Sequence, residues 1–197
     1  MKSQGMLLAL GIALGLVFAR STEAGEVYKI DPAASAIEFQ VKQFLGTVKG
    51  KFSKFRGTID LDREHPARSN VTATIQVRSI DTAIAKRDEH LRSAEFFNVT
   101  KYPEITFQSK SVKQTGTDTG DIVGELAMHG VKKEITLHVK LLGQKGAGAA
   151  ERSQWRVTPE PIKRSEFGLV FSQTAESVSM IGDTVTATME IEAVKAK

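Results

Sequence analysis

The chain has 197 residues, of which 41% are hydrophobic and 25% charged, and its formal net charge is +4 at pH 7. That length suits one globular domain with a hydrophobic core of its own. The absence of cysteine excludes a disulfide scaffold, a thiolate metal site, a cysteine nucleophile and thiol redox chemistry. The small basic excess does not predict a nucleic-acid partner, which would call for more charge gathered on one face.

Residues 1–24 have the pattern of a signal peptide. Lys2 precedes an uncharged apolar run from Met6 to Ala19, which is shorter than the about 20 residues of a typical membrane-spanning helix. Cleavage is expected after Ala19 or Ala24, and Ala24 is favoured because a strand pattern begins at Glu26. The sequence therefore predicts a signal peptide over 1–24, one domain over 25–197, and a periplasmic or secreted product. A retained N-terminal anchor is the alternative.

The rest of the chain alternates between apolar and polar residues, which is typical of strands with one buried and one solvated face. Such alternation favours an antiparallel sheet, because parallel strands are covered on both faces. Turn residues separate the strands at 65–70, 116–120, 130, 143–148 and 181–183. The clearest alternating segments are 37–42, 55–61, 71–77, 105–108, 135–141 and 185–191.

One segment, 81–97, lacks the alternation and contains good helix formers. Asp81 or Thr82 is expected to cap its first turn and Asp88 its second, and Pro103 returns the chain to strand. The prediction is an all-β protein of about eight antiparallel strands with a short helical excursion near residues 82–97. A sheet of that length tends to close into a barrel, which removes its exposed edges.

Several motifs resemble the YceI-like polyisoprenoid-binding family of exported, lipocalin-like barrels. They cover nearly all of 26–194, and the most specific is the run RDEHLRS at 87–93, followed by Phe96, Phe97 and YPEITF at 102–107. Three further segments are similar to the family: YKID at 28–31, the spacing of Val48, Gly50, Phe52, Phe55, Gly57 and Ile59, and RSEFGL at 164–169.

The resemblance implies an extended eight-stranded barrel that holds a long apolar lipid. Isoprenoids, isoprenoid quinones and polyprenyl diphosphates all fit that description, and the implied role is to carry or sequester the lipid outside the cytoplasm. The resemblance implies no cofactor other than the bound lipid, is compatible with a homodimer, and leaves transient membrane contact open. Gln43 stands where many members carry His, and Ala127 where Thr is common, which questions a family contact to the lipid head group at position 43.

The residues themselves leave two readings of the barrel interior, a packed core and a ligand cavity, because eight strands suit either. Three features favour a cavity: ten phenylalanines, small residues on the inward faces, and apolar residues in the helical excursion that suit a lid. The small inward residues are Gly50, Gly57, Ala73, Gly124 and Ala187, and the lid residues are Ile84, Leu91, Phe96 and Phe97. The expected apolar lining is Phe39, Val41, Phe44, Val48, Phe52, Phe55, Ile75, Val77, Leu91, Phe96, Phe97, Ile105, Phe107, Leu126, Met128, Leu137, Phe167, Leu169 and Met189.

A polar head group would need hydrogen-bond donors at the mouth of such a cavity. The candidates are Gln43, Arg87, His90, Arg92 and Arg164. The alternatives are that these residues form a solvated rim, or that Arg87, Asp88 and Arg92 pair with one another to fix the lid.

No catalytic or metal-binding motif accompanies these patterns. The histidines are His65, His90, His129 and His138; His129 and His138 are not expected to meet, and no HExxH, GxSxG, P-loop or GxGxxG sequence occurs. We therefore predict a binding protein rather than an enzyme, with no catalytic or metal site. Two alternatives remain: an enzyme acting on a lipid head group through His90, Arg87 and Arg92, and a filled barrel that binds other proteins.

Overall fold

A computed structural model describes residues 25–171 and 181–196. The predicted signal peptide lies outside these residues. The strands and helices are β1 (Glu26–Ile30), β2 (Ala36–Gln43), β3 (Gly46–Phe52), β4 (Phe55–Leu61), η1 (Pro66–Arg68), β5 (Asn70–Gln76), η2 (Val77–Ser79), β6 (Ile80–Asp81), α1 (Ala85–Arg92), β7 (Glu104–Gln114), β8 (Thr119–Met128), β9 (Val131–Lys145), η3 (Gly148–Ala150), β10 (Arg152–Pro159), β11 (Ile162–Lys163), η4 (Arg164–Phe167) and β12 (Thr184–Lys195).

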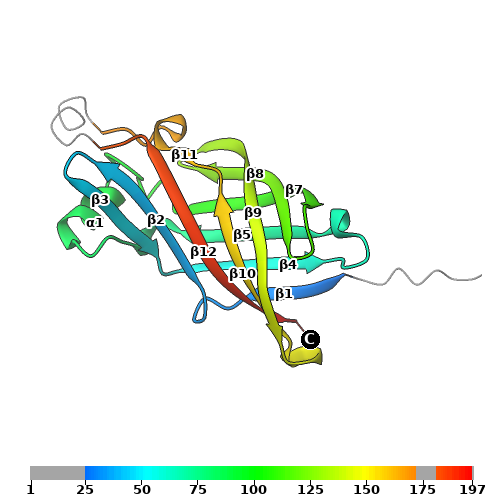
Figure 1. The fold of residues 1–197 in the computed structure, drawn as a ribbon. Coiled ribbons are helices and arrows are strands. Elements are labelled where there is room, and N and C mark those ends of the chain that lie inside the picture. Colours follow the sequence, from blue (N-terminus) through cyan, green and yellow to red (C-terminus); the bar gives the residue numbers. More distant parts are fainter. Residues whose placement is uncertain (1–24, 172–180, 197) are drawn as a thin grey trace, which may run out of the picture.

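The strands close into an eight-stranded antiparallel barrel with one short α-helix, which confirms the predicted fold class (Figure 1). Hydrogen bonds run through β1, β4, β5, β7, β8, β9, β10 and β12, and the barrel closes where β12 pairs with β1. The long strand β12 has two partners along the same edge: its last residues, Ala193 to Lys195, pair with β1, and its first part, Val185 to Glu190, pairs with β2. The hairpin of β2 and β3 therefore extends the barrel wall beside the first part of β12.

Alternation located the strands correctly, since every segment singled out for its period of two lies in a strand or in the turn that directly follows it. In β8, for example, Ile122, Gly124, Leu126 and Met128 are buried and the residues between them are only partly buried. The predicted turn at Gly130 is present and has a φ of 78°. The predicted loop at 143–148 begins later, because β9 continues to Lys145 in pairing with β10.

The helical excursion forms α1, but its predicted side-chain caps are wrong. The helix begins after Ile84, which makes no side-chain cap. Ala83 has a φ of 63°, and Asp81 accepts a hydrogen bond from its backbone N–H at 2.8 Å. The chain thereby brings Thr82 next to the helix, and the Asp88 carboxylate accepts hydrogen bonds from both the backbone N–H and the hydroxyl of Thr82. Asp88 therefore fastens the helix to the preceding strand rather than capping a turn.

The barrel has two different ends (Figure 1). The helix end carries α1, the β2–β3 turn, the β8–β9 turn and η4; its parts are joined by hydrogen bonds such as Gly182 N–H to the Lys42 carbonyl at 2.7 Å and Arg164 N–H to the Asp183 carbonyl at 3.0 Å. The terminus end carries the start of β1, the end of β12, η1 and the β7–β8 and β9–β10 loops.

Candidate functional site

A cavity of about 600 Å³ lies inside the barrel, and its wall is almost wholly apolar. Its lining runs from Val185 to Ile191 along β12 and from Ile135 to Leu141 along β9. Each of these two stretches spans six residue steps along a strand, which corresponds to a cavity length of about 20 Å. The cavity is therefore long as well as dry, which suits an extended hydrocarbon chain better than a compact ligand.

Most of the side chains predicted to line the interior do line this cavity. They come from β2, β3, β4, β5, β7, β8, β9, β12, α1 and the segments that follow α1 and η4. They are Phe39, Val41, Val48, Phe52, Phe55, Ile75, Leu91, Phe96, Phe97, Ile105, Phe107, Leu126, Met128, Leu137, Leu169 and Met189.

Three predicted lining residues lie elsewhere. Phe44 is 73% exposed, because it lies in the β2–β3 turn, and the alternation that turns Phe39 and Val41 inward already assigns position 44 to the outward face. Val77 and Phe167 are each only 1% exposed and do not line the cavity. Val77 lies in the 3-10 turn η2, where the period of two used to place it no longer applies. Phe167, which belongs to the RSEFGL segment similar to the family, lies in the 3-10 turn η4.

The inward glycines do not leave the free space that the sequence suggested. A side-chain carbon at Gly124 would overlap the ring of Phe107, and one at Gly50 would overlap the ring of Phe39. Gly57 is covered by Ile30 in the same way. These glycines allow large side chains on neighbouring strands to lie flat against the wall. Ala73 and Ala187, in contrast, do line the cavity.

Aromatic rings gather where the cavity reaches the helix end. Phe96 stacks on Phe171 with ring centroids 4.5 Å apart and packs edge-on against Phe97 at 5.2 Å. The imidazole ring of His90 also stacks on Phe171, with the two ring centroids 5.8 Å apart. Ile84 is 51% exposed and lies outside the cavity, so that the predicted lid consists of Leu91 and the two phenylalanines without it.

Three of the five head-group candidates lie at this end of the cavity wall. Arg87 donates to the Thr82 hydroxyl and carbonyl, both at 2.8 Å. Arg164 is 6% exposed, donates to the Leu169 carbonyl at 2.7 Å and lies 5.4 Å from the ring centroid of Phe171. Together with His90 they place donors beside the aromatic rings, although Arg87 and Arg164 already serve the fold.

The other two candidates point elsewhere. Arg92 donates to the backbone carbonyls of Arg78, at 2.9 Å, and Ile80, and does not line the cavity. Gln43 borders a separate surface groove between the β2–β3 hairpin and the segment before α1. One alternative was that Arg87 and Arg92 pair with Asp88. Instead, both arginines donate hydrogen bonds to the chain that precedes the helix.

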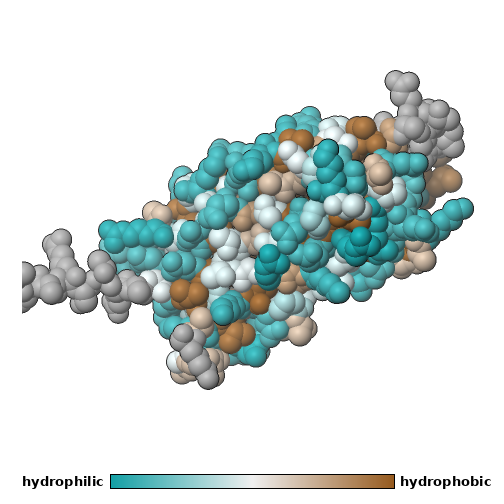
Figure 2. Space-filling view, turned by 180° about the vertical axis from the view of Figure 1, so that it is seen from behind, coloured by the Kyte–Doolittle hydropathy of each residue, from teal (hydrophilic) through white to brown (hydrophobic). Residues whose placement is uncertain are grey.

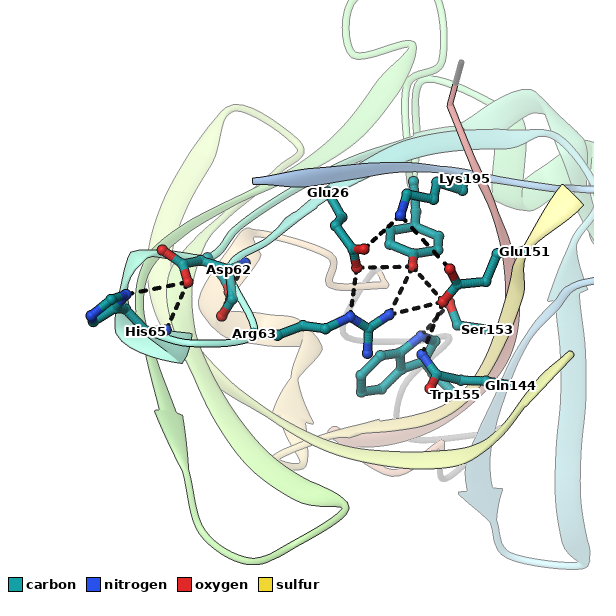
Figure 3. Close-up of polar contacts among 11 residues, drawn as sticks. Glu26, Asp62, Arg63, His65, Gln144, Glu151, Ser153, Trp155 and Lys195 are labelled. Atoms are coloured by element: carbon teal, nitrogen blue, oxygen red, sulfur yellow. Dashed lines mark hydrogen bonds and ion pairs between the residues drawn. The ribbon is translucent and has the colours of Figure 1, made fainter. Parts of the chain in front are cut away.

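At the terminus end, five polar side chains from distant parts of the chain form one network (Figure 3). Arg63 lines the cavity and reaches across the barrel; its guanidinium donates to Glu26 at 2.5 Å, to the Tyr28 hydroxyl at 2.8 Å and to Glu151 at 2.9 Å. Tyr28 donates to Glu151 at 2.8 Å, and Lys195 donates to Glu26 at 2.5 Å.

The network changes the acidity of two of its members. The hydrogen bond from Lys195, with those from Arg63, lowers the pKa of Glu26 to about 2. Burial, together with the hydrogen bond to Glu151, raises the pKa of Tyr28 to about 12. Within the network, the carboxyl of Glu26 therefore stays ionised and the hydroxyl of Tyr28 stays neutral over the ordinary pH range. No local sequence pattern announced it, because its members come from four separate segments.

Trp155 is a further lining residue that the sequence reasoning missed. It lies on β10 opposite Leu141 and Ile191, and its indole N–H donates to the buried Ser153 hydroxyl at 2.9 Å (Figure 3). Because Trp155 is the single tryptophan of the chain, its fluorescence can report on the cavity directly.

The histidines do not converge on a reactive centre. His129 Nδ1 lies 3.0 Å from the Phe167 carbonyl and His138 Nδ1 lies 2.8 Å from the Asp121 carboxylate, so the two do not meet, as expected. Within residues 25–171 and 181–196, no three His, Asp or Glu side chains are grouped so that they could hold a metal ion. Over the same residues, no helix has the length and apolar character needed to cross a membrane.

Comparison with known proteins identifies the family to which this chain is similar. Residues 28–193 match the YceI-like domain. The chain is 44% identical over 142 residues to protein YceI of Shigella flexneri, an alignment that covers 70% of this chain and 73% of that protein.

Two solved structures share the fold. BcnA of Burkholderia cenocepacia superposes with a TM-score of 0.73 and 24% identity, covering 83% of this chain and 98% of that one. A polyisoprenoid binding domain from Saccharophagus degradans superposes with a TM-score of 0.66 and 19% identity, covering 86% and 98%.

Proposed function

The chain belongs to the YceI-like family, and on that premise we propose that it binds one long-chain apolar lipid inside its barrel. The candidate ligands are isoprenoids, isoprenoid quinones and polyprenyl diphosphates, and the role would be to carry or sequester them in the periplasm or outside the cell. The name of the Saccharophagus relative, a polyisoprenoid binding domain, supports this ligand class.

The observation that carries the proposal is the long apolar cavity. Each methylene group moved from water into such an interior contributes about 0.8 kcal/mol, so that a chain of several isoprene units binds without many polar contacts. The alternative was a barrel filled by the same inward residues as a packed core. The long apolar cavity favours the ligand-binding interpretation over that alternative.

The head group of the lipid is proposed to lie at the helix end. There Phe96, Phe97 and Phe171 gather in the cavity wall beside His90, Arg87 and Arg164. A quinone ring would stack among Phe96, Phe97 and Phe171. A diphosphate would instead favour the two arginines, whose guanidinium groups suit phosphate oxygens.

The test uses the fluorescence of Trp155, because a quinone that enters the cavity quenches it. Titration of the purified protein with a long-chain quinone should give saturable quenching at one quinone per barrel, and polyprenyl diphosphates should compete. Ala187→Phe, which fills the cavity, should weaken binding by about tenfold or more. Thr186→Phe, its neighbour on the exposed face of β12, is the matched control. Equal quenching in the two variants would refute binding inside the barrel.

His90 distinguishes binding from catalysis on the head group. If the protein only binds, His90→Ala should change affinity by a few-fold and offered lipids should be recovered unaltered by mass spectrometry. If wild-type protein converts the lipid and His90→Ala binds it without converting it, the enzyme alternative is correct.

A further inference from the structure

The tip of the β2–β3 hairpin carries two adjacent exposed apolar side chains. Phe44 is 73% exposed and Leu45 is 87% exposed. They form the turn between Gln43 and Gly46, at the outermost point of the hairpin (Figure 1). Two large apolar residues so fully in contact with water contribute nothing to the core, and such groups mark interaction sites when they gather with others.

Further exposed apolar residues lie at the same end of the barrel. Ile84, just before α1, is 51% exposed, and Val170, just after η4, is 48% exposed. A surface groove joins the hairpin to Ile84. Figure 2 shows hydrophobic residues reaching the surface among hydrophilic ones near this end, beside the grey atoms at its upper right. We call Phe44, Leu45, Ile84 and Val170 the apolar rim.

Basic residues stand beside the tip. Lys163 on β11 is paired in register with Thr184 of β12, and Lys42 follows Val41, which is paired with the next residue of β12, Val185. Lys49 lies on β3 opposite Gln40, two residues further along β3 than Thr47, which is paired with Lys42. Within the described residues, no carboxylate lies within 4.0 Å of these three ammonium groups. Lys42 and Lys49 therefore offer their charge to an anionic surface. Lys163 also interacts with Glu166 and Asp183, because its charge helps to lower the pKa of both carboxyl groups.

The cavity reaches the same end, where His90 and Phe171 belong to its wall. We propose that the apolar rim, led by Phe44 and Leu45, inserts into the headgroup region of an anionic phospholipid bilayer and holds the helix end of the barrel against it. This inference rests on the proposed lipid-binding function, because it gives the lipid a route between the bilayer and the cavity without passing through water.

The chemistry of the tip favours a bilayer over a protein partner. The apolar residues lie on a projecting turn, and apolar anchors flanked by lysines suit the boundary between acyl chains and anionic headgroups. The opposite end offers a natural comparison, since its exposed large apolar residues, Val27 at 38% and Leu142 at 42%, lie on strands.

The test is flotation of the purified chain with vesicles of phosphatidylcholine, with and without phosphatidylglycerol. The double variant Phe44→Ser, Leu45→Ser should bind at least about tenfold more weakly. The matched control Val27→Ser, Leu142→Ser should bind like the wild type. Binding of the wild type should be stronger to vesicles that contain phosphatidylglycerol and weaker at high salt, and Lys42→Glu, Lys49→Glu should abolish that preference.

Quinone quenching of Trp155 keeps the two proposals separate. The tip variant should still bind quinone in solution, which also shows that it is folded, while its transfer of quinone between vesicles slows in proportion to its lost vesicle binding. The inference is overturned if the tip variant floats as the wild type does, or if the control loses as much binding.

It is also overturned if the tip variant only converts a dimer to a monomer in sedimentation, because the rim is then an interface between copies of this chain. Flotation without any quinone binding would refute the proposed function and leave the docking surface standing.

Discussion

The two ends of the barrel are built from different interactions. At the terminus end, Arg63 reaches across the barrel to carboxylates on other strands, and charged hydrogen bonds tie together segments that are remote in the sequence (Figure 3). At the helix end, stacked rings of Phe96 and Phe171 line the cavity, and apolar side chains project into solvent beyond them.

The difference indicates how one barrel can be both stable and accessible. Charge-assisted hydrogen bonds have narrow geometric requirements and hold the terminus end in one arrangement. Aromatic and aliphatic contacts have no such directional requirement, so that the helix end can admit an apolar chain without leaving buried polar groups unsatisfied. Changes at the terminus end should therefore act mainly on stability, and changes at the helix end mainly on lipid exchange, with one informative exception.

That exception is Arg164, for which we predict the largest loss of stability. Its buried guanidinium donates to the Leu169, Ile181 and Gly182 carbonyls. Arg164→Met keeps the apolar stem and removes these donors, and should lower the free energy of unfolding by about 3 kcal/mol. Urea denaturation measures the change. A loss below about 1 kcal/mol would mean that the charge is kept for the ligand rather than for the fold.

Breaking the network at the terminus end should have a smaller effect. Arg63→Ala removes hydrogen bonds to Glu26, Tyr28 and Glu151. The Arg63 side chain is 41% exposed, so water replaces part of the hydrogen bonding that is lost. We expect a loss of about 2 kcal/mol in urea denaturation. Quinone affinity should change little. If Arg63→Ala instead abolishes binding while the protein remains folded, the head group lies at the terminus end and our placement is wrong.

Acid should weaken the terminus end in a defined pH window. The folded pKa of Glu26 is about 2, below its ordinary value of 4.5, so its contribution is complete above pH 4.5 and is lost as the pH falls toward 2. Lys195→Met removes the main cause of that shift. The wild type should therefore lose more stability than Lys195→Met between pH 5 and pH 2, as measured by urea denaturation at each pH. Parallel curves would show that Glu26 is not held by this network.

The smallest predicted effect is that of Tyr28→Phe. The tyrosine is 1% exposed, and its hydroxyl joins Arg63 to Glu151. Those two residues also bond directly to each other, so removing the hydroxyl should cost only about 1 kcal/mol. Thermal unfolding at neutral pH measures it. Double-mutant analysis with Arg63→Ala should give a smaller loss than the sum of the two single losses.

The strands and most of the cavity wall could be predicted because both follow from alternation along a single segment. Phe39 and Leu137 were placed correctly from their neighbours alone. Phe44 was misplaced although the alternation of Phe39 and Val41 already assigns position 44 to the outward face, where the turn leaves its ring in solvent. Val77 was misplaced because a short 3-10 turn replaces the end of the predicted strand. Phe167 was placed by its family motif alone, which does not show that it lies buried in the 3-10 turn η4.

What the sequence could not predict depends on contacts between distant segments. Glu26, Arg63, Glu151 and Lys195 look like ordinary surface charges until the barrel brings them together. Arg87 and Asp88 resembled partners for each other, yet both bond to Thr82 because the chain turns back before α1. The inward glycines suggested empty space, which the rings of neighbouring strands occupy instead.

Native mass spectrometry of the protein, expressed from its full sequence and purified without detergent, tests the central claim most directly, with organic extraction to identify what is bound. The account predicts one long-chain apolar lipid per barrel, retained by Thr186→Phe and lost by Ala187→Phe. A protein that is empty, and stays empty when quinones and polyprenyl diphosphates are offered, would contradict it.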